Sequence, residues 1–380
     1  MKNQNIICFA KDWQEDPTSN NHIMLGLSKH NKVLWLNSLA ARNPKLTSGR
    51  DISKIFLKLR SAFSSLHRVN DNMTVFTPLV APYPYSRLAQ FVNRIILRLM
   101  LGRLRRKLGM KHFQLWTFLP TSEPYVGHMG EDFSVFYCTD ESSQFTSSDT
   151  RSVVDMERKL CRKADLVFAT AQSLVDKRLE YNPNTVLARH GVDYHHFAKA
   201  LDDSISPPAD VSGLKGPVLG FFGLIHDWID LELLEEVARR RPNWNIVLIG
   251  NSLVPLGTLP ELPNVLALGR KPYDELPAYC SVFDVGIIPF KVNELTRHVN
   301  PIKLREYLSA GLPVVSTPMD EVSHFAPDCR VAGNVEGFIE ACEDALSSED
   351  SRDTVSARMA NQTWDAVIDA VGKEVTQRLG

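Results

Sequence analysis

The sequence predicts an α/β protein built from two doubly wound, Rossmann-like domains. Short apolar, β-branched segments alternate with amphipathic helical segments along most of the 380 residues, which is the pattern of repeated βα units around a parallel sheet. The net charge of −1 also conceals two unlike halves, because residues 1–200 hold 28 basic and 17 acidic side chains whereas residues 201–380 hold 15 and 27. This asymmetry supports two domains, one of which could face an anionic surface.

The first domain is expected to cover residues 1–200. Its predicted strands are residues 6–10, 33–36, 75–78, 113–118, 133–137 and 166–169. Its predicted helices lie around residues 23–27, 55–63, 87–112 and 152–163, and Gly102 could interrupt the third of these. Residues 204–210 have the composition of a linker, so a second domain is predicted from residue 211 to residue 361.

The second domain repeats the βα pattern. Its strands are predicted at residues 217–223, 245–250, 265–269 and 285–290, with helices at 231–241 and 274–280. Residues 300–317 then read as helix, stop and strand, with Asn300 as the cap, Pro301 as the first helical residue and Gly311 at the end.

Candidate site residues follow the predicted strands, where open α/β sheets bind their ligands. In the second domain these are Gly223, Gly250 and the start of the helix that carries Lys303 and Glu306. In the first domain Asp12, Asp140 and Glu141 are candidates for acceptor binding or for a catalytic base, the alternative being loop solvation or helix capping. For Lys303 and Glu306 the alternative is a solvated ion pair.

Several classes of protein lack support. The sequence has no Walker A loop, no GxGxxG after a strand and no GxSxG elbow, which argues against a P-loop kinase, a dehydrogenase and a serine hydrolase. The six cysteines are scattered without metal-ligand spacing, and no apolar run approaches the ~20 residues of a membrane-spanning helix. The N-terminus reads as a strand rather than as a signal peptide. What remains is a phosphate-bearing ligand such as a sugar nucleotide, held by helix amides, Lys303 and Glu306.

Residues 87–112 form a predicted helix with eight basic residues and no acidic residue. We expect this helix to face anionic lipid headgroups. The alternative is an ordinary sheet-packed helix with a solvated basic side, and nucleic acid is disfavoured because no recognition motif accompanies the charge. The membrane-facing residues would be Arg98, Arg103, Arg105, Arg106 and Lys107.

An ordered set of short motifs resembles the GT-B glycosyltransferases, above all the family-4-like bacterial enzymes that build capsules, exopolysaccharides and teichuronic-type polymers. The resemblance is strong over the second half and weak over the first. The motifs are Ala-Asp-Leu-Val at 164–167, His-Gly-Val-Asp at 190–193 with Phe197, and residues 220–223, 245–250, 269–279, 284–290 and 300–317.

The resemblance implies two domains that face a central cleft. The first would bind the acceptor and be completed by a helix at residues 362–380, and the second would bind the donor. Glu306 falls where the family binds the donor ribose, the amides near Asn300 and Ile302 fall at the diphosphate, and residues 269–273, with Arg270 and Tyr273, would flank the base.

Two positions depart from the family. His298 stands where the family has its first motif glutamate, and residues 224–230, which include His226, lack the family's basic residues. Charge on the leaving diphosphate would therefore fall to Lys303 with Arg297 or His298. His298 is for this reason a catalytic candidate, and neither a retaining nor an inverting mechanism is assigned.

The sequence therefore predicts a metal-independent glycosyltransferase without a cofactor, working in bacterial surface polysaccharide synthesis. Its donor would be a UDP-, GDP- or dTDP-linked sugar and its acceptor a glycan or a lipid-linked glycan. It is expected in the cytoplasm, at the inner face of the plasma membrane. A sugar-nucleotide epimerase of the same fold and a catalytically inactive membrane scaffold are the alternatives.

Overall fold

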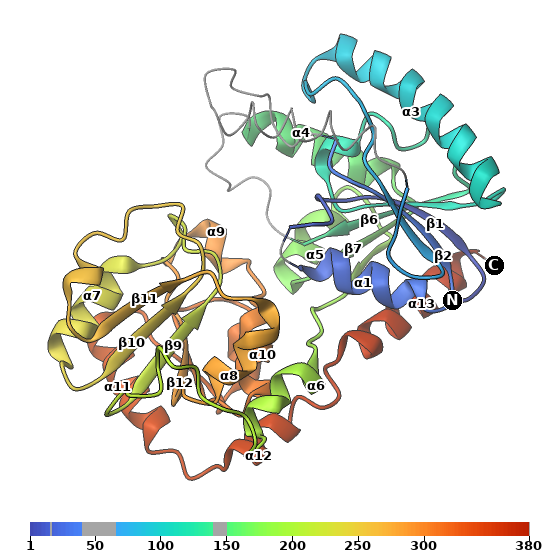
Figure 1. Ribbon diagram of the computed structural model, residues 1–380. Helices are drawn as coiled ribbons and strands as arrows, with labels where there is room; N and C mark the ends of the chain where they lie inside the picture. Colours follow the sequence, from blue (N-terminus) through green and yellow to red (C-terminus); the bar gives the residue numbers. More distant parts are fainter. Residues whose placement is uncertain (16, 40–65, 140–149, 380) are drawn as a thin grey trace. The chain divides into compact units, whose positions relative to one another are not determined.

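The computed structural model describes residues 1–15, 17–39, 66–139 and 150–379 (Figure 1). The chain divides into two compact units, residues 1–189 with 367–380 (unit 1) and residues 190–366 (unit 2). Each unit has its own largely or wholly parallel sheet covered by helices and its own apolar core. The predicted class, α/β with two Rossmann-like units, is confirmed. The cleft between them stays a prediction.

In the described part of unit 1 the sheet has eight strands in the order β3-β4-β2-β1-β5-β6-β7-β8. All neighbours are parallel except β3 and β4. Central strands such as β6 are buried along their whole length, as their continuous apolar sequence predicts. The strands are β1 (Asn5–Phe9), β2 (Lys32–Leu36), β3 (His67–Arg68), β4 (Met73–Phe76), β5 (Gln114–Thr117), β6 (Phe133–Cys138), β7 (Leu166–Ala169) and β8 (Thr185–Leu187).

The helices of unit 1 include α13 (Trp364–Leu379), through which the C-terminal part of the chain returns to this unit. Residues 367–380 belong to unit 1, and a Cβ on Gly26 of α1 would overlap Ile368 of α13, so these two helices approach closely (Figure 1). The predicted helix at residues 55–63 lies outside the described residues. The helices are α1 (Ser19–Ser28), α3 (Arg87–Leu108), η1 (Pro120–Ser122), α4 (Thr150–Lys163), α5 (Gln172–Leu179) and α13 (Trp364–Leu379).

Helix α3 is continuous, so the break expected near Gly102 is wrong. Ser86 caps its start by accepting from Ala89 N at 3.4 Å, and Gly109 ends it at φ 68°. Gly102 costs the helix some stability but does not force it to end, because a single glycine removes neither a backbone hydrogen bond nor a helical conformation.

In the described part of unit 2 the sheet has six strands, all parallel, in the order β11-β10-β9-β12-β13-β14. Strand β9 lies at the centre and every one of its residues is buried. The strands are β9 (Val218–Phe222), β10 (Asn245–Ile249), β11 (Val265–Gly269), β12 (Val285–Ile288), β13 (Val314–Ser316) and β14 (Cys329–Val331).

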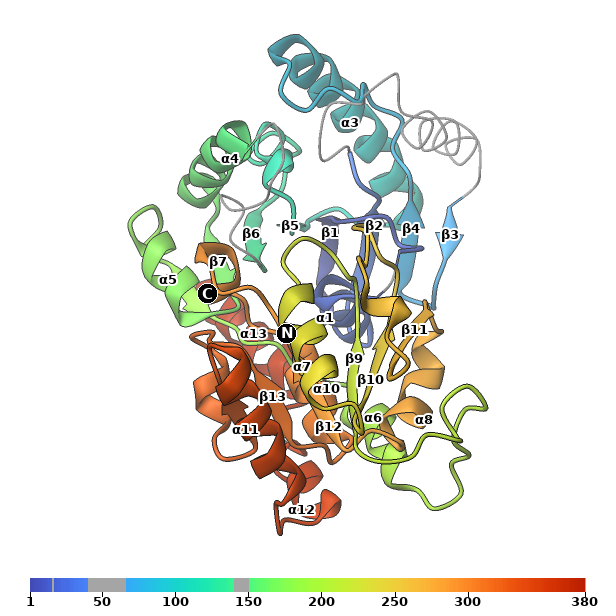
Figure 2. The same ribbon diagram turned by 90° about the vertical axis from the view of Figure 1, so that its left-hand side faces the viewer.

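Unit 2 has its helices on both sides of this sheet (Figures 1 and 2). Side-chain caps set where several of them begin: Asp230 accepts from Leu233 N at 2.9 Å before α7, and Asn334 accepts from Gly337 N at 2.8 Å before α11. The helices are α6 (Tyr194–Phe197), η3 (Ala198–Leu201), α7 (Leu231–Arg240), η4 (Leu259–Glu261), η5 (Tyr273–Glu275), α8 (Leu276–Cys280), α9 (Glu294–Arg297), α10 (Ile302–Ser309), η6 (Val322–Phe325), α11 (Val335–Leu346) and α12 (Arg352–Ala357).

The boundary between the units lies at residue 189/190, before the predicted one at 200–211. Residues 190–200 belong with unit 2 because Val192 and Phe197 are buried in its core, where the ring of Phe197 stacks on Phe222 at 5.8 Å. Residues 204–210, which have the composition of a linker, are therefore a surface loop of unit 2. Among the described residues no helix is both long enough and apolar enough to cross a membrane.

Candidate functional site

Two glycines make the ends of β9 and β10 free of side chains. Gly223 and Gly250 have φ values of 139° and 145°, which side chains rarely allow. The amide of Gly223 donates to Ile249 O at 2.8 Å, and a Cβ on Gly250 would overlap Gly223 O. Only glycine fits at either position, so the predicted importance of both residues has a geometric basis. The carboxyl edge of the sheet therefore presents only backbone atoms at Gly223 and Gly250. These two residues are called the floor of the site.

Lys303 of α10 extends over this floor. A Cβ on Gly223 would lie 2.9 Å from Lys303 Nζ, and the same ammonium lies 5.4 and 5.6 Å from the ring centres of Phe221 and Phe290. The side chain is half-buried between the two rings. Burial lowers the pKa of Lys303, and the neighbouring Glu306 carboxylate opposes that shift. A cation is thus held at the strand ends with little solvent around it.

Glu306 lies one turn further along α10 and is also half-buried. Burial raises its pKa to about 7, Lys303 acts to lower it, and Asp193 raises it further. Within the described part of the chain, the side chains of Lys303 and Glu306 form no hydrogen bond or ion pair with each other or with another residue. Both groups therefore keep their hydrogen-bonding capacity for a ligand.

The opposite side of α10 anchors the helix in the core. Leu304 and Leu308 are fully buried, and the amide of Phe222 donates to the Tyr307 hydroxyl at 3.0 Å. A Cβ on Gly286 of β12 would overlap the Tyr307 ring, so the helix packs directly on the sheet. This packing holds Lys303 and Glu306 in place.

The start of α10 differs from the prediction. Pro301 is the N-cap residue and Ile302 the first helical residue, with no side-chain cap bond. Asn300 was expected to cap, but its Oδ1 accepts from Arg305 Nη1 at 2.7 Å, and both side chains are buried. The buried guanidinium competes successfully for the amide oxygen because an uncompensated buried charge is far costlier than an uncapped helix end. The backbone amide near Ile302 stays at the helix N-terminus.

Tyr273 lies on another side of the same site. Its ring stacks on His196 at 4.5 Å and 8°, and it meets Phe197 edge-on at 5.7 Å. Burial raises the pKa of the Tyr273 hydroxyl, and the charges of Glu306, Asp193 and Asp274 raise it further. Asp193 belongs to the His-Gly-Val-Asp motif at residues 190–193, so this motif could have identified it as a residue near the site.

Arg270 and His226 are two further residues predicted to lie near the donor. Arg270 is exposed after β11. The His226 ring stacks on Trp228 at 4.2 Å and 13°, and its Nδ1 contacts the Asp227 carboxylate. The Asp227 carboxylate therefore already accompanies this imidazole.

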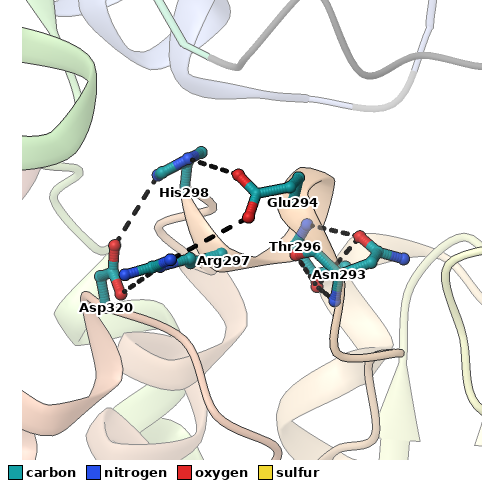
Figure 3. A network of polar contacts seen from close by, with 6 residues as sticks. All are labelled: Asn293, Glu294, Thr296, Arg297, His298 and Asp320. Carbon is teal, nitrogen blue, oxygen red and sulfur yellow. Dashed lines mark hydrogen bonds and ion pairs between the residues drawn. The ribbon is translucent and has the colours of Figure 1, made fainter. Parts of the chain in front are cut away.

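His298 and Arg297 form a separate polar cluster at the end of α9 (Figure 3). His298 is buried, with Nε2 3.6 Å from Glu294 Oε2 and Nδ1 3.7 Å from Asp320 Oδ2. Arg297 is exposed, with Nε 3.4 Å from Asp320 Oδ1 and Nη1 4.0 Å from Glu294 Oε1. Carboxylates thus already accompany both groups, which leaves Lys303 as the stronger candidate for a ligand's negative charge.

The candidate residues predicted in unit 1 are Asp12, Asp140 and Glu141. Asp12 Oδ1 accepts from Ser38 N at 3.0 Å, so this carboxylate supports the loop after β1. Asp140 and Glu141 lie outside the described residues. Among the residues that the structure describes, no group of three or more His, Cys, Asp or Glu side chains is arranged to hold a metal ion. Independence of metals remains a prediction.

Residues 216–348 match the model of the family described as glycosyl transferases group 1. The matched residues all lie within unit 2. The chain is also 31% identical over 256 residues to TuaH of Bacillus subtilis (strain 168), whose name assigns it provisionally to teichuronic acid biosynthesis as a glycosyltransferase. That match covers 61% of this chain and 63% of the relative, less than two thirds of its length.

Solved structures share the whole fold at low identity. Sucrose-phosphate synthase from Thermosynechococcus elongatus has a TM-score of 0.71 at 14% identity and covers 99% of both chains. Anabaena HepE in complex with UDP and glucose has a TM-score of 0.65 at 14% identity, covering 98% of this chain and 99% of its own. These likenesses extend over both units, and the GT-B fold expected from the sequence is confirmed.

Proposed function

We propose that the protein transfers a sugar from a nucleotide-diphosphate sugar to a glycan or lipid-linked acceptor in the synthesis of a bacterial surface polysaccharide. The observation that carries this proposal is the pair Lys303 and Glu306, half-buried without polar partners among the described residues and next to the bare backbone of Gly223. The family match within unit 2, the name of TuaH and the UDP and glucose bound to HepE support it.

The roles follow from charge and geometry. The diphosphate would lie at the N-terminus of α10, where free amides near Ile302 and the helix dipole favour an anion, with Lys303 as the cation. Glu306 would accept hydrogen bonds from the ribose diol. The base would lie toward Arg270 and Tyr273. When the glycosidic bond breaks, negative charge grows on the diphosphate, and a fixed, poorly solvated ammonium stabilises it more than water does.

Calorimetric titration with UDP and GDP tests these assignments. Lys303→Ala should weaken binding of the preferred nucleotide at least tenfold, and Glu306→Ala should remove discrimination between that nucleotide and its 2′-deoxy form. Lys215→Ala and Glu261→Ala serve as matched controls, because both residues are exposed near the amino ends of the strands. If both site variants bound like the parent, the donor site would lie elsewhere. Epimerised donor formed without acceptor would favour the epimerase.

We also propose that the enzyme works at the cytoplasmic face of the plasma membrane, with basic residues of α3 on anionic headgroups. Arg98, Arg103, Arg106 and Lys107 are exposed and fit this role. Arg105 fits it less well, since its guanidinium lies 4.2 Å from the Phe113 ring centre and donates to Met110 O and Lys111 O. Binding to anionic vesicles should weaken as salt rises, and no binding at low salt would remove this part of the proposal.

A further inference from the structure

One face of α3 exposes an unusual set of large apolar side chains. They occur at spacings of three and four residues, so they line one side of the helix. The exposed fractions are 73% for Leu88, 57% for Phe91, 40% for Val92, 47% for Ile95, 38% for Ile96 and 58% for Leu99. Single exposed apolar residues are ordinary, but a continuous patch of this kind marks an interaction surface.

The other face of the helix is fixed to unit 1, so the apolar face cannot simply turn inward. Leu97 and Leu101 are buried in the core. Asn93 is buried between them and the preceding loop: it accepts from Ala81 N at 2.8 Å and donates to Ala81 O at 2.9 Å. Losing this two-way bond would leave buried polar groups unsatisfied, which costs ~1–3 kcal/mol for each group. The rotation of α3 about its axis is therefore specified.

The same face becomes basic toward the end of the helix. From Leu99 the stripe continues at helical spacing to Arg103 and Arg106, both exposed. Residues 87–112 include eight basic residues and no acidic one. In both views α3 runs along the outer edge of unit 1 (Figures 1 and 2). One face of one helix thus presents an apolar half and a basic half.

We propose that α3 is an interfacial helix that inserts its apolar stripe into an anionic lipid leaflet. Leu88, Phe91, Ile95 and Leu99 would reach the boundary of the acyl chains, while Arg103 and Arg106 would contact phosphate groups. The charge decides for lipid over a protein partner, because a one-signed basic rim beside an apolar face complements the surface of an anionic bilayer. This inference concerns apolar insertion and is independent of the proposed sugar transfer.

Vesicle flotation of the full chain provides the test, with phosphatidylglycerol-containing and pure phosphatidylcholine vesicles. The triple variant Phe91→Ser/Ile95→Ser/Leu99→Ser should lower the partition coefficient at least tenfold, because its three apolar side chains no longer leave water. Leu179→Ser/Val331→Ser/Leu379→Ser is the matched control, since these side chains are 45%, 43% and 41% exposed outside α3 and should change nothing. Arg103→Gln/Arg106→Gln should weaken binding about fivefold per residue at low salt.

A Phe91→Trp variant measures insertion directly. Its added fluorescence should shift to the blue and be quenched by lipids brominated on the acyl chains when anionic vesicles are added. Binding without this quenching, or a triple variant that binds vesicles like the parent, would overturn the proposal. So would a parent that is dimeric by light scattering and becomes monomeric only in the triple variant, because the face would then be a protein interface. Unchanged UDP binding in the triple variant would separate this result from the donor site.

Discussion

Helices α3 and α10 use their two faces in opposite ways. Helix α10 buries its apolar residues Leu304 and Leu308 completely and leaves Lys303 and Glu306 at the open ends of the strands. Helix α3 buries a polar residue, Asn93, and exposes an apolar stripe that includes Leu88 and Leu99. Both sequences have clear helical periodicity. The pattern therefore identifies which residues share a face, but the packing of the rest of the chain decides which face is covered.

The difference has a physical cause in what each helix meets. Helix α10 lies directly on β12, where Tyr307 packs against Gly286 and its hydroxyl accepts from Phe222 N, so a polar side chain on that side without such a partner would lose its water without compensation. Helix α3 meets the loop at Ala81, whose backbone needs hydrogen-bond partners that Asn93 supplies. Helix α3 therefore keeps an apolar face toward solvent because Asn93 fixes its opposite face to unit 1. An exposed apolar face of this size indicates an interaction surface.

The largest expected effect on stability comes from a substitution at the strand ends beneath α10. Gly250→Ala should lower the free energy of unfolding by about 4 kcal/mol, because the new Cβ meets Gly223 O and φ is unfavourable for alanine. Urea unfolding followed by circular dichroism measures it. Gly213→Ala is the control, since nothing lies within 4 Å of a Cβ there. A loss below ~1 kcal/mol would show that the strand ends can separate.

Replacement of a leucine by alanine should lower the free energy of unfolding far more in α10 than in α3. Leu304→Ala in α10 should cost about 3 kcal/mol, because it removes a fully buried side chain and leaves a cavity. Leu99→Ala in α3 should cost less than ~0.5 kcal/mol, because its side chain already lies in water. The same unfolding measurement in the absence of lipid gives both values. Similar costs would mean that α3 buries this face in solution.

The raised pKa of Glu306 predicts a dependence of stability on pH. With a folded-state pKa of about 7 against an ordinary 4.5, the folded protein keeps this proton to higher pH than the unfolded chain, so stability falls as pH rises through this window. Glu306→Gln removes the effect. Relative to the parent, the variant should gain roughly 3 kcal/mol between pH 4.5 and pH 8. Parallel curves for the parent and the variant would contradict the shift.

The smallest effect concerns the middle of α3. Gly102→Ala should raise the free energy of unfolding by about 1 kcal/mol, because alanine favours a helix interior and no atom lies within 4 Å of the new Cβ. Gly109→Ala is the contrasting variant, since φ at this position is 68° and the substitution should destabilise. A destabilising Gly102→Ala would show that the helix needs flexibility there.

Sequence reasoning reached the fold and part of the site. Apolar runs such as 218–222 mark buried parallel strands, and Gly223 and Gly250 could be assigned to strand ends because glycine often allows such turns. The cap was misassigned because the sequence does not show that Arg305 is buried and needs Asn300. Asp320 was missed because it lies far along the chain from His298, whose Nδ1 it approaches. Asp193, although part of the His-Gly-Val-Asp motif, was not linked to Glu306 because only the fold brings its charge near that carboxylate.

The sequence by itself determined the βα order, the place of Lys303 and Glu306 on one helix and the one-signed charge of residues 87–112, because these depend on local periodicity and composition. Only the tertiary structure decided that Lys303 lies over Gly223, that carboxylates surround His298, and that the apolar face of α3 points to solvent. Burial is a property of the whole packed chain, since each side chain competes with all others for the limited space in the core.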